Sequence, residues 1–316
     1  MPAAHATPGP LVVIGGAEDK LGTRTILSRF VQLAGRKAAR IVVLSTASAL
    51  GDAATLAYKQ LFAEMGVTDV RGLRPLTRAE SNDPATAAVL DDATALFMTG
   101  GNQLRLSAVV SGTLLGQAIQ ALHARGGVIA GTSAGASVQG ELMPSFGAAG
   151  TTPKQRMVQL SAGLGLLRGA IVDQHFEQRN RIGRLLALVV SSPSHLGLGI
   201  DEDTAIVVTG STMEVLGRGA VTVIDGAHAE SDAYEVKGTR PLLVSGVILH
   251  SLPSGTRFDL AERRLLPALR AIRADPEPIP LEPVRRLVDR IAAEGADDAV
   301  VARNARRRAR RGSSAD

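Results

Sequence analysis

Short apolar runs alternate with amphipathic stretches along the first two thirds of this 316-residue chain. The runs are rich in Val, Ile, Leu and Ala, and they lie at residues 10–15, 40–44, 67–73, 95–98, 127–130, 170–172, 197–200 and 205–208. Helical patterning separates the earlier runs, and this alternation is typical of a parallel sheet covered by helices. We therefore predict an α/β fold with a mostly parallel central sheet flanked by helices.

The pattern changes after about residue 211. Shorter apolar runs, broken by Gly and Asp, lie at residues 212–216, 220–224 and 242–249, and they predict an antiparallel extension of the sheet. A proline-rich stretch at 276–283 is typical of a linker, and it precedes a helical pattern that ends in clustered arginines. The expected organisation is a disordered N-terminus (1–9), one α/β domain (10–275), and a linker, C-terminal helix and Arg-rich tail (276–316).

Composition excludes several classes of function. The chain has no cysteine, which rules out disulfides, thiolate chemistry and Cys-based zinc sites. It has no tryptophan and only 3% aromatic residues, which argues against an aromatic stacking platform for single-stranded nucleic acid. No signal peptide or membrane-spanning segment is evident in the sequence, so we expect a cytoplasmic protein with no membrane partner.

The net charge of +5 comes from one end of the chain. Six arginines gather near the C-terminus, at Arg303, Arg306, Arg307, Arg308, Arg310 and Arg311, and removing them from the balance leaves −1. Such a tail can bind nucleic acid or another polyanion by charge alone, or it can be a solvated helix end. Because the body of the chain is not basic, we do not expect a nucleic-acid partner.

A candidate nucleophile follows the apolar run at 127–130. The segment Gly131-Thr132-Ser133-Ala134-Gly135 joins that run to small residues able to start a helix, which is the layout of a nucleophile elbow. A serine at the tip of such a turn is accessible, and the helix that follows directs unpaired backbone N–H groups toward it. The pattern also occurs in ordinary Gly/Ser turns, so it does not identify Ser133 by itself.

Paired glycines follow the run at 95–98. Gly100 and Gly101 allow the backbone to approach a ligand closely, and an N–H group of one of them, with that of Ala134, would form an oxyanion hole. An ordinary tight turn is the alternative. The glycines at 15 and 16 fit no phosphate-binding motif, so Glu18 and Asp19 after them are expected to cap a helix or brace the floor of the active site.

A polar stretch from Asp173 to Leu186 follows the run at 170–172. His175, at a strand end, could be the general base that takes the serine proton. The guanidinium groups of Arg179, Arg181 and Arg184 would suit a substrate that bears carboxylates. The alternative is a solvated basic helix face.

Three acids, Asp201, Glu202 and Asp203, follow the run at 197–200. One of them could orient the histidine base. If the strand continues, Asp201 and Asp203 share a face and Glu202 takes the other, but spacing alone does not choose among the three. A divalent-metal site is a competing interpretation that lacks a second ligand group.

Together these motifs resemble the cyanophycinases, serine peptidases related to the aspartyl dipeptidases. The resemblance spans about residues 11–208 in the same order, and its most specific part is the Asp173-Gln174-His175-Phe176 block with the arginines that follow. It implies a class I glutamine-amidotransferase-like α/β core with serine at the nucleophile position. It also implies hydrolysis of cyanophycin, a poly-aspartate backbone with arginine on each β-carboxyl, to β-Asp-Arg dipeptides.

The resemblance also implies roles for individual residues. Ser133 would be the nucleophile, His175 the base and Glu202 the acid that orients it. The substrate pocket would be lined by Gln103, Asp173, Gln174, Arg179, Arg181 and Arg184. The resemblance implies a homodimer. It implies neither a metal nor an organic cofactor.

Two alternatives remain at this point. A related aspartyl or isoaspartyl dipeptidase would share Ser133 and His175 but act on short peptides. A polyanion-binding protein would use the tail at residues 303–311 and leave the motifs of the core unexplained.

Overall fold

A computed structural model describes residues 7–267. These residues belong to one compact unit, Met1–Ala271, and the predicted linker, C-terminal helix and Arg-rich tail lie outside the described residues. Of the stretch expected to be disordered, residues 1–6 also lie outside, whereas Gly9 is buried and donates its backbone N–H to His123 O (2.8 Å).

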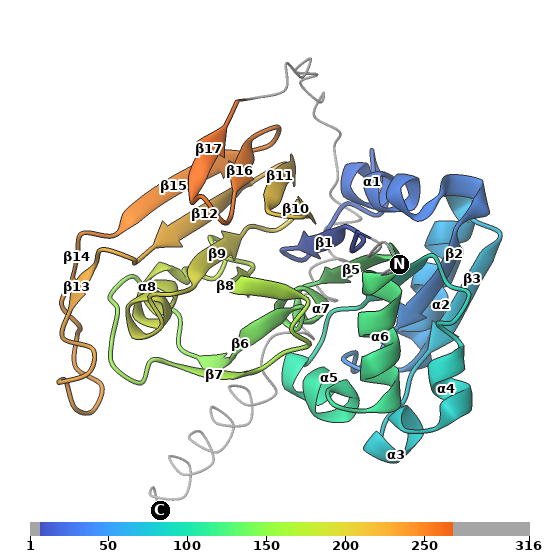
Figure 1. Cartoon of the computed structure of the whole chain (residues 1–316), viewed down its shortest axis with the longest axis horizontal. Helices are drawn as coiled ribbons and strands as arrows, with labels where there is room; N and C mark the ends of the chain where they lie inside the picture. The colour runs from blue at the N-terminus through green and yellow to red at the C-terminus, as the bar shows by residue number, and fades with distance from the viewer. Residues whose placement is uncertain (1–6, 268–316) are drawn as a thin grey trace, which may run out of the picture. The chain divides into compact units, whose positions relative to one another are not determined.

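The first five strands of the chain belong to a nine-stranded sheet (Figure 1). Five adjacent strands are parallel: β1 (Leu11–Ile14), β5 (Val128–Thr132), β4 (Ala95–Met98), β2 (Arg40–Leu44) and β3 (Asp69–Leu73). On the other side of β1 the sheet continues through antiparallel strands: β10 (Thr204–Thr209), β11 (Thr212–Gly217), β16 (Arg257–Asp259) and β17 (Arg264–Leu266). The five parallel strands end at one edge, where Ser133 follows β5.

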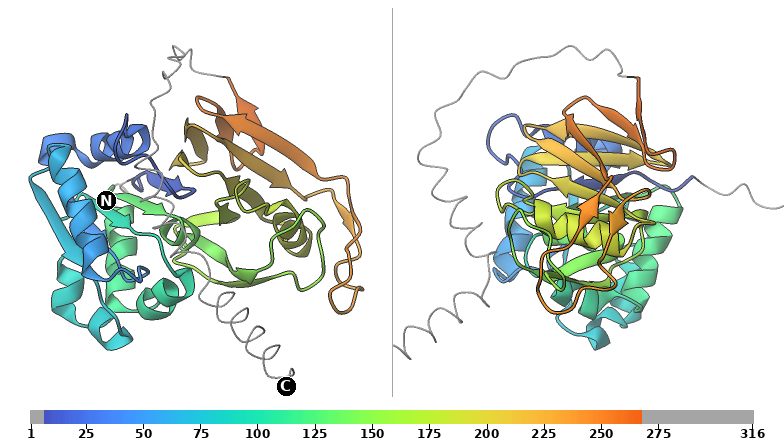
Figure 2. Two further views of the ribbon diagram at one scale, coloured as in Figure 1. Left: turned by 180° about the vertical axis from the view of Figure 1, so that it is seen from behind. Right: turned by 90° about the vertical axis from the view of Figure 1, so that its left-hand side faces the viewer.

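A second sheet has six strands in the order β15, β12, β9, β8, β6, β7. Its parallel centre consists of β6 (Gly140–Gly147), β8 (Leu167–Gln174) and β9 (Leu196–Ile200). Antiparallel strands flank it: β7 (Val158–Ala162), β12 (Ala220–Asp225) and β15 (Ile248–Pro253). A short hairpin, β13 (Glu230–Ser231) with β14 (Val244–Ser245), lies near α8 (Ile182–Ser191) in Figures 1 and 2.

Helices cover both faces of the nine-stranded sheet. Val12 and Ile14 of β1 pack in the core beneath α1 (Thr25–Ala34) and α2 (Asp52–Glu64), whereas the alternate residues Leu11 and Val13 face the opposite core. That opposite core includes α5 (Gln103–Val110), α6 (Leu114–Ala124) and the inner face of the second sheet. The remaining short helices are η1 (Arg36–Ala38), α3 (Arg78–Ser81), α4 (Pro84–Ala88) and α7 (Ala134–Ser137).

An aromatic cluster fixes the strand that leads to Gly100. Phe97 of β4 is fully buried and contacts Phe30, Phe62 and Tyr58 with ring centroids 4.6–5.5 Å apart. Aromatic pairs at such spacing add to the stabilisation that burial gives. The cluster joins α1 and α2 to β4, and so anchors one wall of the site.

The α/β class is confirmed, and the antiparallel strands after residue 211 are present. The division into two sheets was not predicted, because a strand buried on both faces has the same apolar composition in either sheet. The consecutive strands β11 and β12, for example, belong to different sheets. The strands β6 and β7 were missed, since β6 contains Pro144 and ends in Gly147 and neither strand forms a continuous apolar run.

Candidate active site

Ser133 lies between β5 and α7 in a strained backbone conformation. Its φ is 52° and its ψ is −108°, a region that is unfavourable for a residue with a side chain. The turn is held by the Ser133 N–H, which donates to Ile14 O (3.0 Å). A Cβ at Gly131 would lie 2.0 Å from Gly135 O, so glycine is required there. The strand, turn and helix around Ser133 are those predicted for a nucleophile elbow.

His175 follows β8 and reaches Ser133 from the second sheet. Its Nε2 lies 2.9 Å from Ser133 Oγ, and its Nδ1 lies 2.6 Å from Glu202 Oε1. The backbone N–H of His175 donates to Gly15 O (2.8 Å). The imidazole ring packs against Gly16, where an added Cβ would lie 2.2 Å from His175 Cε1. The imidazole therefore rests against a glycine loop, with each ring nitrogen hydrogen-bonded.

Of the three acids after β9, only Glu202 contacts His175. The strand ends at Ile200, and the acids lie in a turn in which Asp203 has a φ of 48°, so the strand does not continue as the alternation argument assumed. Asp201 accepts two backbone N–H groups, at 3.1 and 3.0 Å, and Asp203 accepts one at 2.8 Å. In this turn the three carboxylates therefore point to different partners, and only that of Glu202 points to His175.

The environment favours a neutral histidine and an ionised acid. Burial lowers the pKa of His175, and the positive charges of Arg179 and Arg181 lower it further, while the bond to Glu202 acts in the opposite direction. The hydrogen bond from His175 lowers the pKa of Glu202. A neutral imidazole that accepts at Nε2 is the form a general base requires.

Asp173 is fully buried and paired with two arginines. Arg184 donates to both of its carboxylate oxygens, from Nε at 2.6 Å and from Nη2, and Arg181 Nη1 lies 3.2 Å from Oδ1. Arg181 Nη1 also donates to the backbone and side-chain oxygens of Gln174, the latter at 2.8 Å. Although burial lowers the pKa of Arg181 to about 10, it stays charged at neutral pH. Contacts of this cluster therefore hold the residue just before His175.

The other predicted pocket residues are Gln103 and Arg179. Gln103 begins α5 after the Asn102 side chain caps the helix, and its Nε2 donates to Pro144 O of β6 (3.0 Å). Arg179 donates its N–H to His175 O (3.1 Å), and its charge lowers the pKa of both His175 and Glu202. Arg179 thus adjoins His175, and Gln103 joins the start of α5, three residues after Gly100, to the second sheet.

Backbone donors lie close to the serine. A Cβ at Gly100 would lie 3.4 Å from Ser133 Cβ, and one at Gly101, where φ is 136°, would lie 2.1 Å from Ala47 O. Among residues 7–267, the N–H groups of Gly100, Gly101 and Ala134 have no hydrogen-bond acceptor. These are the donors predicted for an oxyanion hole.

A buried network beside the serine extends beyond the predicted residues. Glu18 Oε2 accepts from Thr132 Oγ1 (2.5 Å), and Glu18 Oε1 accepts from Tyr58 OH (2.5 Å). Burial raises the pKa of Glu18, but the charge of Lys20 and the two hydroxyl bonds outweigh this and lower it overall. The sequence suggested an acid that caps a helix or braces the site: Asp19 accepts the backbone N–H groups of Leu21, Gly22 and Arg24 in the loop before α1, and α1 itself has no side-chain cap. Nothing in the sequence pointed to Tyr58.

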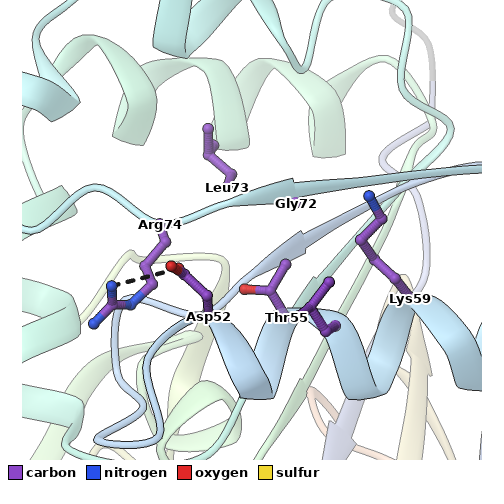
Figure 3. A pocket seen from close by; sticks show the side chains of 7 residues that line it. Asp52, Thr55, Lys59, Gly72, Leu73 and Arg74 are labelled. Carbon is purple, nitrogen blue, oxygen red and sulfur yellow. Dashed lines mark hydrogen bonds and ion pairs between the residues drawn. The ribbon is translucent and has the colours of Figure 1, made fainter.

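A shallow pocket of about 350 Å³ lies away from these residues, between α2 and β3 (Figure 3). It is lined by Lys59, Thr55, the Asp52–Arg74 pair and their neighbours, and none of the residues that line it is a catalytic candidate. Within the described chain, no three His, Asp or Glu side chains are arranged to hold a metal ion. None of the helices in residues 7–267 combines the length and apolar character needed to span a bilayer.

Comparison with known proteins identifies the family. The model of peptidase family S51 matches residues 11–216. The chain belongs to peptidase family S51. This confirms the resemblance found in the sequence and the prediction of a serine peptidase.

Named relatives of this S51 chain include cyanophycinases from Trichormus variabilis and Nostoc sp. Each is 40% identical over 276 residues, which is 86% of this chain and 92% of the relative. A cyanophycinase of Synechococcus elongatus is 40% identical over 255 residues, 80% of this chain and 79% of the relative. The crystal structure of a peptidase from an acI-B1 Actinobacterium shares the fold, with a TM-score of 0.57 and 22% identity over 77% of this chain and 98% of that one.

Proposed function

We propose that this protein is a serine exopeptidase that hydrolyses the poly-aspartate backbone of cyanophycin and releases β-Asp-Arg dipeptides. The relatives named cyanophycinase support the substrate. The observation that carries the mechanism is the hydrogen-bond chain from Ser133 Oγ to His175 Nε2 (2.9 Å) and from His175 Nδ1 to Glu202 (2.6 Å). These contacts support the proposed roles of Ser133 as nucleophile, His175 as base and Glu202 as the acid that orients the base.

The reaction proceeds through an acyl-enzyme. His175 Nε2 takes the Ser133 proton as Oγ attacks a backbone carbonyl carbon, and the resulting imidazolium gives that proton to the leaving amine as the C–N bond breaks. Water then attacks the ester, His175 takes a proton from it, and the proton returns to Ser133 as the product acid leaves. Glu202 stays ionised and stabilises the imidazolium in both steps.

The oxyanion that forms in each step needs donors that are already in place. The N–H groups of Ala134 and of Gly100 or Gly101 suit this role, because they have no acceptor among the described residues. Ala134 directly follows Ser133, and a Cβ at Gly100 would lie 3.4 Å from Ser133 Cβ. Preorganised donors of this kind cost no rearrangement during the reaction, and removing one typically costs about 10²–10³-fold in kcat.

The charges around His175 suit the substrate's carboxylates. Asp173 neutralises one of its two arginines, so the buried cluster keeps a net positive charge, to which Arg179 adds. We assign the substrate pocket to the residues predicted from the sequence: Gln103, Asp173, Gln174, Arg179, Arg181 and Arg184. Because Arg184 already binds both oxygens of Asp173, the buried cluster acts on substrate carboxylates through its net positive charge, and the amides supply neutral donors and acceptors.

The deciding experiment incubates purified protein with cyanophycin and detects β-Asp-Arg by mass spectrometry, with Ser133→Ala as the control. The parent should release the dipeptide, and Ser133→Ala should lose turnover by about 10⁵–10⁶-fold while remaining folded. Substantial activity in Ser133→Ala would refute the nucleophile assignment. Turnover of short aspartyl peptides in place of the polymer would make the protein an aspartyl or isoaspartyl dipeptidase. Salt-sensitive polyanion binding by residues 303–311 without peptidase activity would support the non-catalytic alternative.

A cytoplasmic location and a homodimer complete the proposal; the location rests on the sequence, and the homodimer rests on the family resemblance. Size-exclusion chromatography with light scattering tests the homodimer: a mass twice that of the 32.8 kDa chain supports it, and the mass of a single chain refutes it.

A further inference from the structure

The loop that follows β1 makes backbone contacts with the base and the acid. The Gly15 carbonyl accepts from the His175 N–H, and the Gly16 carbonyl accepts from the N–H of Asp203, the neighbour of Glu202, both at 2.8 Å. The His175 ring rests on Gly16, where a side chain would not fit. This loop therefore fixes the base and the acid relative to the end of β1.

The same loop contacts the nucleophile's neighbour through one side chain. The Glu18 side chain is 1% exposed, and its Oε2 accepts from Thr132 Oγ1 at 2.5 Å. Its Oε1 accepts from Tyr58 OH at 2.5 Å and lies 2.9 Å from Lys20 Nζ. Thr132 immediately precedes Ser133 in the chain. By binding the Thr132 hydroxyl, the Glu18 carboxylate therefore restrains the backbone from which the nucleophile projects.

We propose that Glu18 is a positioning residue that holds Ser133 in its reactive conformation through Thr132. The proposal rests on Ser133 being the nucleophile. A residue with a φ of 52° and a ψ of −108° keeps that conformation only when its surroundings hold it. A buried ionised carboxylate is suited to this task, because hydrogen bonds to a charged acceptor are stronger than neutral ones.

The cluster contains its own control. Thr132 and Tyr58 donate equally short bonds to the same carboxylate, but only Thr132 adjoins Ser133 in the chain. If Glu18 acted only as a packed and satisfied core acid, loss of either hydroxyl would have the same consequence for catalysis. If Glu18 positions Ser133, loss of the Thr132 hydroxyl should impair catalysis more than loss of the Tyr58 hydroxyl does.

The test compares kcat and KM of Thr132→Val, Thr132→Ser and Tyr58→Phe, with the melting temperature of each. Thr132→Val should lower kcat by about 10- to 100-fold with little change in KM, because a misplaced nucleophile slows the chemical step more than it weakens binding. Thr132→Ser restores the hydroxyl and should recover kcat to within about threefold of the parent, and Tyr58→Phe should stay in the same range. Equal losses of kcat in Thr132→Val and Tyr58→Phe would overturn the proposal.

Crystal structures of Thr132→Val and Tyr58→Phe give a second readout that needs no substrate. The contact between Ser133 Oγ and His175 Nε2, 2.9 Å here, should be lost in Thr132→Val and kept in Tyr58→Phe. Its survival in Thr132→Val would overturn the positioning role whatever the substrate is. Residual turnover by Ser133→Ala, in contrast, would refute the nucleophile and leave these contacts unchanged.

Discussion

Two buried carboxylates support the two halves of the site, and their partners differ. Glu18, beside the nucleophile, binds two neutral hydroxyls and one lysine whose side chain is 32% exposed. Asp173, next to the histidine segment, binds Arg181 and Arg184, whose side chains are 10% and 6% exposed. A lysine near the surface can turn to water if its partner is lost, whereas the arginines cannot. The histidine half should therefore depend on its buried charge more strongly than the nucleophile half does.

The largest expected effect comes from the acid of the histidine half. Glu202→Gln keeps the shape of the side chain but removes the charge that stabilises the imidazolium, and kcat should fall by about 10⁴-fold. Burial already places the His175 pKa below its usual 6.5, so in the parent kcat/KM should rise with pH through a value below 6.5 and then stay level. Because the bond to Glu202 raises the pKa of His175, Glu202→Gln should move this rise to lower pH.

The neighbouring acid provides the control for that measurement. Asp203 lies in the same turn but accepts the Asp19 N–H and does not contact His175. Asp203→Asn should leave the pH profile of kcat/KM in place. A shift of equal size in both variants would assign the effect to the turn as a whole rather than to Glu202.

Removing the buried carboxylate of the histidine half should have the next largest effect. Asp173→Asn retains the volume but leaves Arg181 and Arg184 without their counter-charge, and the free energy of unfolding should fall by about 3–5 kcal/mol. Asp201→Asn is the matched control, because Asp201 is also buried but accepts two backbone N–H groups and should cost about 1–3 kcal/mol. Urea denaturation measures both. Equal losses would show that the ion pairs contribute no more than ordinary hydrogen bonds.

The nucleophile half and the histidine half differ in how well the sequence predicts them. The elbow at Ser133 was predictable because its chemistry is local: an apolar strand, small residues and a helix start within a few positions. The choice of Glu202 among three acids was not, because it depends on a turn after Ile200 whose direction is fixed by backbone contacts with Gly16 and Asp19, far away in the chain. Spacing along a strand does not apply once the strand has ended.

The side-chain partners within the site were also beyond the reach of sequence patterns. Arg181 and Arg184 were predicted to suit a substrate that bears carboxylates, and the structure places both guanidinium groups on Asp173, with Arg181 at the start of α8. Tyr58 looks in the sequence like an ordinary residue of an amphipathic helix, and only the packing of α2 on the sheet brings its hydroxyl to Glu18. Which side chains pair with each other depends on how the elements pack, and the sequence patterns do not contain that information.

Smaller effects are expected in the nucleophile half, at Glu18 and its partners. The partners of Glu18 lower its pKa in the folded protein, so the ionised carboxylate stabilises the fold above its unfolded pKa of about 4.5, and this contribution is lost as pH falls through the lower folded value. Glu18→Gln should therefore reduce the free energy of unfolding by about 1–3 kcal/mol at pH 7, and the difference from the parent should shrink below about pH 4.5. Urea denaturation from pH 3 to 7 measures it.

Lys20→Met separates the lysine from the hydroxyls in this half. The lysine is partly exposed, so its loss should cost no more than about 1 kcal/mol and should weaken in high salt. A loss in Lys20→Met as large as that in Glu18→Gln would mean that Glu18, like Asp173, depends mainly on its ion pair. Both carboxylates would then be held mainly by positively charged partners. The two halves would differ in how exposed those partners are and not in their chemistry.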